Sequence, residues 1–158
     1  MIVKSTAFEN NGVIPQKHTG FGEDVSPELD ISDAPEDTQS LAVILEDLDV
    51  PFTSRFPHWI AWNIPKTDVI PEGLPKGAKI TEPRPACQGI AWGKHVYRGP
   101  KQPFFIRGEH RYVFTVYALD RFLTLPENAD TKTLREEMCG HILAEAELVG
   151  RYRRIFKL

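Results

Sequence analysis

Four stretches of the chain carry the residue patterns of β-strands. Residues Leu41–Glu46 form a short, nearly continuous apolar run, which is typical of a strand buried on both faces. The segment His58–Ile64 is rich in aromatic and β-branched residues and is followed by Pro65. The segment Arg111–Leu119 gives the strongest strand signal, because apolar residues occupy both of its alternating faces. A weaker strand is predicted over Ile2–Phe8.

Helical periodicity is confined to the C-terminal region. Thr133 followed by Glu136 fits a capping box, and Asp130 and Thr131 are alternative N-caps. Gly140 interrupts the pattern and could end a first segment. The predicted helical face consists of residues at i+4 spacing, Leu134, Met138, Ile142 and Ala146.

Long connections separate these elements. Pro65–Pro85 is predicted to be a long surface loop, and Gln88–Gly108 is a second irregular segment rich in glycine. Within the latter, Phe104–Ile106 is interpreted as a small core or dimer-contact strand. The tail, Leu148–Phe156, could pair as a last strand. Strands early in the chain and a helix late in it predict an antiparallel β-sandwich with a peripheral helix.

Composition and charge further narrow the class of protein that the chain can be. The chain has 13 Pro and 11 Gly, and prolines spread from Pro15 to Pro126 exclude an all-helical bundle. Its 19 Lys and Arg against 22 Asp and Glu give a net charge of −3, which argues against a nucleic-acid partner. No apolar stretch reaches the length of about 18 residues that a membrane span requires. Without repeats or linkers, residues 1–158 are predicted to form one domain.

The cysteines and the N-terminus predict a cytoplasmic protein. Cys87 and Cys139 stand far apart and are interpreted as reduced thiols, with one long-range disulfide as the alternative. Polar residues interrupt the first ten positions, so no secretory signal is predicted. No motif predicts a cofactor or a resident metal.

Polar residues gather where the predicted strands begin and end. Asp47 and Asp49 follow the first strong strand, His58 begins the second, and His110 and Tyr112 begin the third. If these strands are neighbours, the side chains meet at one end of a sheet, where binding residues commonly collect. The alternatives are a simple turn for the two aspartates and structural roles for the histidines.

Several further motifs stand in order along nearly the whole chain. They are Ser26-Pro27, Leu41-Ala42 before Asp47-x-Asp49-x-Pro51, His58-Trp59 with Asn63, Gly99-Pro100, His110-Arg111-Tyr112 and Tyr117–Asp120. Together these motifs resemble the phosphatidylethanolamine-binding protein family, and in particular its prokaryotic, Raf kinase inhibitor-like branch.

The resemblance implies a mainly β fold, in which a large antiparallel Greek-key sheet packs on a smaller second sheet, with a C-terminal helix. It also implies a non-enzymatic protein with a surface pocket for a small anion or a phospholipid headgroup. Within that pocket Asp47 would be the carboxylate, and Asp47 could orient a protonated histidine or bind an ammonium group. The other implied ligand-binding residues are Asp49, His58, Gly99 through its backbone N–H, Pro100, His110 and Tyr112.

Some positions depart from the family pattern. Leu48 stands where the carboxylate motif usually has proline, which is expected to loosen the turn that aims Asp47. Asp24 replaces a more usual asparagine, and we interpret this as a local change in a turn. Lys101 and Arg107 could add a cation near the pocket mouth.

Other functions remain open at this stage. The chain could be a protein-interaction or inhibitor module that binds a kinase or a protease through the Pro65–Pro85 loop. It could also regulate a phosphoprotein, and a homodimer is an expectation from the prokaryotic branch. A lesser alternative is a metal-dependent hydrolase that uses Asp47, Asp49, His58 and His110.

Overall fold

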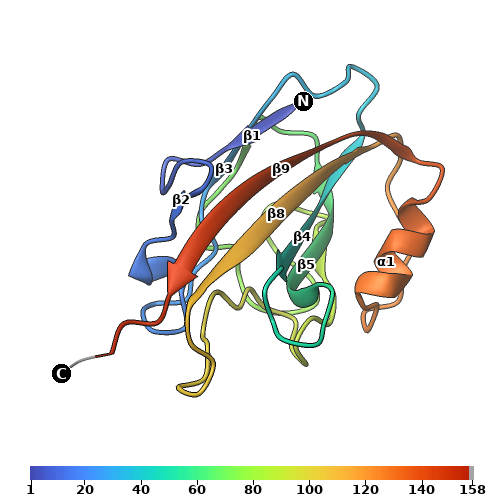
Figure 1. Cartoon of the computed structure of the whole chain (residues 1–158). Coiled ribbons are helices and arrows are strands. Elements are labelled where there is room, and N and C mark those ends of the chain that lie inside the picture. The colour runs from blue at the N-terminus through green and yellow to red at the C-terminus, as the bar shows by residue number, and fades with distance from the viewer. Residues whose placement is uncertain (157–158) are drawn as a thin grey trace.

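Two β-sheets pack face to face, and one α-helix covers the outer face of the larger sheet (Figure 1). The structure, a computed structural model, describes residues 1–156. Its elements in chain order are β1 (Ile2–Lys4), β2 (Gly12–Val13), the 3-10 helix η1 (Gln16–His18), β3 (Leu29–Ser32), β4 (Ser40–Asp47), β5 (Phe56–Pro65), β6 (Val69–Ile70), β7 (Cys87–Gln88), β8 (Glu109–Leu119), α1 (Thr131–Met138) and β9 (Ile142–Arg153).

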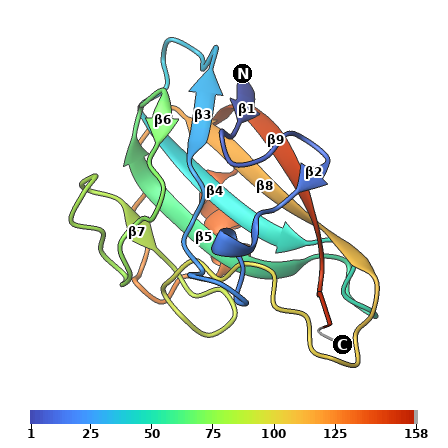
Figure 2. The ribbon, with the colours of Figure 1, turned by 90° about the vertical axis from the view of Figure 1, so that its left-hand side faces the viewer.

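The larger sheet has six strands in the order β2-β9-β8-β4-β5-β7, and the smaller sheet has the order β1-β3-β6. Figure 2 shows the smaller sheet in front of the larger one. Neighbouring strands are antiparallel except for β2 and β9, which run parallel over two residues. The predicted mainly β fold, with a large sheet, a smaller sheet and a C-terminal helix, is confirmed.

Strand β4 is buried on both faces, as its continuous apolar run predicts. Leu41, Val43 and Leu45 face the smaller sheet and join the main core. Ala42 and Ile44 face the other way and join a second apolar cluster under α1. Because side chains alternate along a strand, each face of β4 supplies a different core.

The structure decides among the predicted N-caps and ends the helix earlier than predicted. Asp130, one of the two predicted alternatives to Thr133, is the N-cap, and its carboxylate accepts a hydrogen bond from the Thr133 backbone N–H at 2.9 Å. The helix ends at Met138, and Gly140 has a left-handed φ of 83° that reverses the chain. Strand β9 starts at Ile142 and pairs with β8, so the predicted helical face beyond Met138 is wrong.

A buried carboxylate fastens the helix to the sheet. Glu46 of β4 is 2% exposed and lies on the face that α1 covers. Its Oε1 accepts hydrogen bonds from Arg135 Nη2 at 2.8 Å and from Arg55 Nη1 at 3.2 Å. One helix residue and one residue of the loop before β5 therefore share a single acidic partner.

Other segments differ from expectation in smaller ways. The first strand covers only Ile2–Lys4 of the predicted Ile2–Phe8, and the predicted loop Pro65–Pro85 contains the two-residue strand β6. Phe104–Ile106 forms no strand, and its two phenylalanines are exposed. The core-strand interpretation is therefore wrong. The tail does pair, but over Ile142–Arg153 rather than the predicted Leu148–Phe156. Within residues 1–156, no helix has the length and apolar character to cross a bilayer.

Candidate functional site

Strand register brings the predicted polar residues together at one end of the larger sheet. Asp47 pairs with Tyr112 of β8 on one side and with Phe56 of β5 on the other. His110 precedes Tyr112 by two residues and therefore shares its face of the sheet. This face is the one that turns toward the smaller sheet.

A β-bulge turns His58 toward the same place. Leu45 pairs with Trp59 and Glu46 pairs with Pro57, so His58 is an extra residue in β5. Simple alternation would put His58 and Trp59 on opposite faces of the sheet. With the bulge, Trp59 joins the main core while the His58 ring still lies 5.5 Å from the Tyr112 ring.

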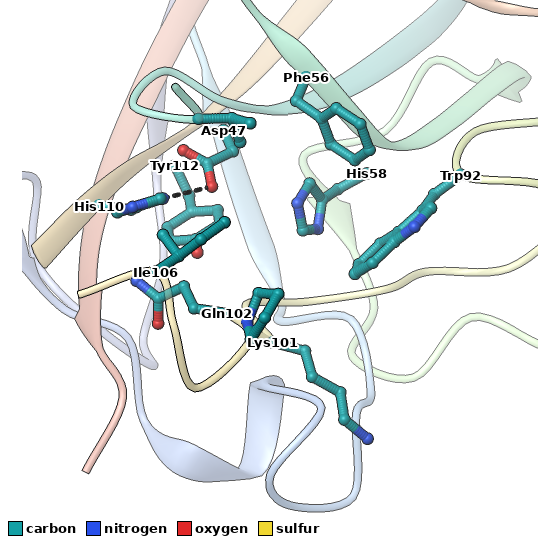
Figure 3. A pocket seen from close by; sticks show the side chains of 11 residues that line it. Asp47, Phe56, His58, Trp92, Lys101, Gln102, Ile106, His110 and Tyr112 are labelled. Atoms are coloured by element: carbon teal, nitrogen blue, oxygen red, sulfur yellow. Dashed lines mark hydrogen bonds and ion pairs between the residues drawn. The ribbon is translucent and has the colours of Figure 1, made fainter. Parts of the chain in front are cut away.

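These side chains surround a cavity of about 140 Å³ (Figure 3). Strands β4, β5 and β8 supply one side, and two loops supply the rest. The cavity holds more than one water molecule and suits a small ion or a headgroup. Its lining residues are Asp47, Val50, Phe56, His58, Trp92, Lys101, Gln102, Pro103, Ile106, His110 and Tyr112.

A buried carboxylate–imidazole pair forms one wall. His110 Nδ1 donates to Asp47 Oδ2 at 2.7 Å, as the dashed line in Figure 3 marks, and both residues are less than 5% exposed. The other oxygen of Asp47 accepts from the Asp49 backbone N–H at 2.8 Å. With both oxygens occupied, Asp47 orients His110, which is one of its two predicted roles.

The His58 ring is held by the loop opposite it. Its Nδ1 donates to the Arg98 backbone oxygen at 2.7 Å, which leaves Nε2 available to a ligand. Burial lowers the pKa of His58 below its ordinary value of 6.5. The ring is consequently neutral at neutral pH, and an anion beside Nε2 would favour its protonation.

Two buried polar atoms of the cavity wall have no hydrogen-bond partner among the described residues. They are the hydroxyl of Tyr112 and Oε1 of Gln102. Burial, together with the Asp47 carboxylate, raises the pKa of Tyr112 well above its ordinary value, so the hydroxyl keeps its proton. Buried polar groups are nearly always paired, so these two unpaired atoms are exceptional in the cavity wall.

Aromatic side chains form the opposite wall. The Trp92 ring lies 4.8 Å from the His58 ring, and the Phe56 ring lies 5.7 Å from each of them. The Arg98 guanidinium stacks on the Trp92 ring, 3.9 Å from the ring centroid. Arg98 Nη1 also donates a hydrogen bond to the Trp92 backbone oxygen at 2.7 Å, so two contacts hold the tryptophan in place. Sequence reasoning did not assign Trp92 or Phe56 to the site. The Trp-Gly pair within a glycine-rich loop was the available signal for Trp92.

Three predicted site residues do not line the cavity. Asp49 turns outward, where Arg111 binds it through Nη2 at 2.8 Å and Nε at 3.0 Å. The backbone N–H of Gly99 donates to Asp24 Oδ1 at 2.7 Å, so it is occupied within the protein. Pro100 is buried between loops, and its oxygen accepts from the Gly20 N–H at 2.9 Å. Asp24 thus has a larger role than the predicted change in a turn.

Leu48 contributes a backbone hydrogen bond to the turn after β4. Its backbone N–H donates to the Arg111 oxygen at 2.9 Å and extends the ladder between β4 and β8. A proline at this position would lack that donor. The hydrogen bond therefore holds the turn in a way that a proline could not.

The four residues of the hydrolase alternative do not form a metal-ligand set. In the part of the chain that the structure describes, no group of three or more His, Cys, Asp and Glu is placed to hold a metal ion. Asp49 is engaged by Arg111, while Asp47 and His110 bind each other.

Comparisons with known proteins agree on one family. The family model described as phosphatidylethanolamine-binding protein matches residues 4–153. UPF0098 protein PH1269 of Pyrococcus horikoshii is 43% identical over 151 residues, which cover 95% of this chain and 75% of that protein.

Two crystal structures share the fold over nearly their whole length. The phosphatidylethanolamine-binding protein homolog CT736 of Chlamydia trachomatis superposes with a TM-score of 0.84 at 36% identity, covering 98% of this chain and 97% of that one. YbcL of E. coli, described as a new member of the mammalian phosphatidylethanolamine-binding protein family, has a TM-score of 0.86 at 27% identity. The match covers 97% of this chain and 98% of that one. The chain described here therefore belongs to the phosphatidylethanolamine-binding protein family.

Proposed function

We propose that the cavity binds a small anionic group, such as phosphate, sulfate or the phosphate of a lipid headgroup, without catalysing a reaction. The observation that carries the proposal is the Tyr112 hydroxyl, which is buried in the cavity wall, keeps its proton and has no partner among the described residues. A buried donor of this kind costs free energy until a ligand accepts its hydrogen bond.

The other groups complete an anion site whose charge depends on pH. His58 supplies Nε2 and His110 supplies its second ring nitrogen, since Nδ1 of each ring is already bonded within the protein. An anion stabilises the protonated form of His58, so binding is coupled to proton uptake. Lys101 lies at the exposed edge of the cavity and adds a positive charge there.

The cavity also suits a zwitterionic ligand. Gln102 Oε1 is an unpaired acceptor in the same wall, so it could receive a hydrogen bond from an ammonium group. The aromatic rings of Phe56 and Trp92 line the cavity and provide an apolar surface beside it. Phosphoethanolamine carries both groups and is the ligand that would use both ends of the site.

Titration by NMR tests this proposal. Sulfate, phosphate and phosphoethanolamine are added separately while the ring signals of His58 and His110 are followed. We expect saturable shifts of both rings with all three ligands, and loss of the response in His58→Ala. Unchanged ring signals at millimolar concentrations of all three ligands would refute the proposal.

A further inference from the structure

The loop of residues 101–107 lines the cavity with one side and presents exposed aromatic rings on the other. Gln102, Pro103 and Ile106 line the cavity, and Pro103 is also exposed, so the cavity opens to solvent here. Phe104 and Phe105, which stand between Pro103 and Ile106, turn outward, with 66% and 70% of their surface exposed. Their rings pack edge to face, with the ring centroids 5.5 Å apart. Two adjacent exposed phenylalanines thus stand beside the mouth of the cavity.

The end of the described chain carries two further exposed apolar side chains. Ile155 is 73% exposed and Phe156 is 46% exposed. Arg154 Nη1 donates a hydrogen bond to the backbone oxygen of Gln102 at 3.0 Å, and the Arg107 guanidinium lies 5.6 Å from the centre of the Phe156 ring. These two contacts join the segment after β9 to the loop before β8. We call the four side chains Phe104, Phe105, Ile155 and Phe156 the aromatic rim.

Four cationic residues stand close to the aromatic rim in the sequence, and two of them, Arg107 and Arg154, lie beside the Phe156 ring, although the whole chain has a net charge of −3. Lys101, Arg107 and Arg153 are exposed, and Arg154 is half-buried. None of the four forms an ion pair with another residue in the range 1–156. The nearest carboxylate in sequence, that of Glu109, is already bound by Arg151 at 2.9 Å.

We propose that the aromatic rim docks on the surface of a bilayer that contains anionic lipids. Exposed aromatic rings insert at the boundary between headgroups and acyl chains, and neighbouring Lys and Arg side chains are attracted to anionic headgroups. Docked in this way, the protein holds the mouth of its cavity at the level of the headgroups. The cavity would then take a headgroup directly from the bilayer, and this last step rests on the proposed function.

A second copy of the chain fits this surface less well. Dimers are usually symmetric, so the same patch of each copy meets its equivalent. The cations around the aromatic rim would then face one another and repel, whereas an anionic bilayer neutralises them.

Vesicle sedimentation tests the docking surface. The full chain is mixed with vesicles of phosphatidylcholine alone, or of phosphatidylcholine with about one third phosphatidylglycerol. The double variant Phe104→Ser, Phe105→Ser removes the two rings without disturbing buried contacts. The matched control is Phe122→Ser, because Phe122 is 41% exposed and follows the opposite end of β8.

We expect the wild-type chain and Phe122→Ser to sediment only with the anionic vesicles, and the double variant to lose apparent affinity about tenfold or more. Added salt should weaken the association. Failure of the wild-type chain to sediment with anionic vesicles would overturn the proposal, as would equal sedimentation of the double variant. If light scattering shows a wild-type dimer that the double variant abolishes, with no vesicle binding, the rim is an interface between copies and the proposal is wrong.

A pocket variant separates this inference from the proposed function. We expect His58→Ala to lose the NMR response to sulfate but to sediment with anionic vesicles like the wild-type chain. If the sulfate titration fails while sedimentation still depends on Phe104 and Phe105, the anion site is refuted and the docking surface stands. If the sulfate titration succeeds but sedimentation does not depend on Phe104 and Phe105, the docking surface alone is refuted.

Discussion

His110 donates a hydrogen bond through Nδ1 to Oδ2 of Asp47 at 2.7 Å, and both side chains are buried at the edge of the cavity. Asp47 ends β4 and His110 lies near the start of β8, so this bond joins two neighbouring strands where the site is formed. It also settles which ring nitrogen of His110 remains for a ligand.

Asp47→Ala should destabilise the fold. Two donors, His110 Nδ1 and the Asp49 backbone N–H, would lose their acceptor in a buried place. We expect the free energy of unfolding in urea to fall by about 2–4 kcal/mol. The control is Asp49→Ala, which breaks a half-exposed ion pair with Arg111 and should cost about 1 kcal/mol or less. Equal losses in the two variants would contradict the assignment of Asp47 as the buried anchor.

Tyr112→Phe should separate binding from stability. The hydroxyl is buried without a partner among residues 1–156, so removing it should not lower the free energy of unfolding and should raise it by about 1 kcal/mol or more. Sulfate would lose a charge-assisted hydrogen bond, and its affinity should fall about tenfold or more. Isothermal titration calorimetry and urea unfolding measure the two quantities. A large loss of stability with unchanged sulfate affinity would show that the hydroxyl serves the fold.

Sulfate should bind more tightly in mild acid. Burial lowers the pKa of His58 below 6.5, so the neutral ring prevails at neutral pH and must gain a proton to bind an anion well. Sulfate keeps its own charge between about pH 5.5 and about pH 7.5, so any change in its affinity over this range must come from the protein. We expect affinity to rise several-fold on going from the higher to the lower pH, and His58→Gln to remove most of that rise. A flat profile in the wild-type chain would refute the coupling.

His58 should also make the unfolding free energy depend on pH. Since its pKa is lower in the folded chain than in the unfolded one, the unfolded chain binds more protons below pH 6.5. Its contribution to stability is therefore complete above pH 6.5 and is lost as the pH falls through the folded-state pKa. Urea unfolding at several pH values should show this loss, with a shallower fall in His58→Gln. Identical profiles for the two proteins would exclude His58 as the source.

Arg135→Ala should loosen the helix from the sheet. It removes the strongest partner of the buried Glu46 carboxylate, while Arg55 remains. Because Arg135 is itself 38% exposed, we expect a loss of about 1–3 kcal/mol rather than the full cost of a buried pair. Lys132→Ala on the same helix breaks an exposed pair with Glu136 and should cost less than about 0.5 kcal/mol. A comparable loss for both variants would contradict the role given to Glu46.

Local patterns predicted the strands well and the helix end poorly. The apolar segments Leu41–Glu46 and Arg111–Leu119 match β4 and β8, because a strand buried on both faces has a short, nearly continuous apolar sequence. Residues from Ile142 onward also fit helical spacing, yet β9 pairs with β8 along their whole length. Gly140 was the one local sign that the helix ends, and tertiary pairing decided the rest.

The candidate site could be predicted only where it lies on strands. Asp47, His58, His110 and Tyr112 were all singled out, and the structure places them around one cavity. Gly99 does not line that cavity, and its N–H binds Asp24, which is 75 residues away in the sequence. Contacts between distant loops of this kind leave no periodic signal, and the same holds for the packing of Trp92 against Arg98.

The bulge in β5 makes the site sensitive to deletion in a way that substitutions would not reveal. Removing one codon between Pro57 and Trp59 would restore regular alternation and leave the pairing of Trp59 with Leu45 intact. The mutant chain would keep its apolar core and nearly the same composition, yet lack the imidazole opposite Tyr112. A design that transfers the pocket to another sheet must therefore carry the extra residue with it.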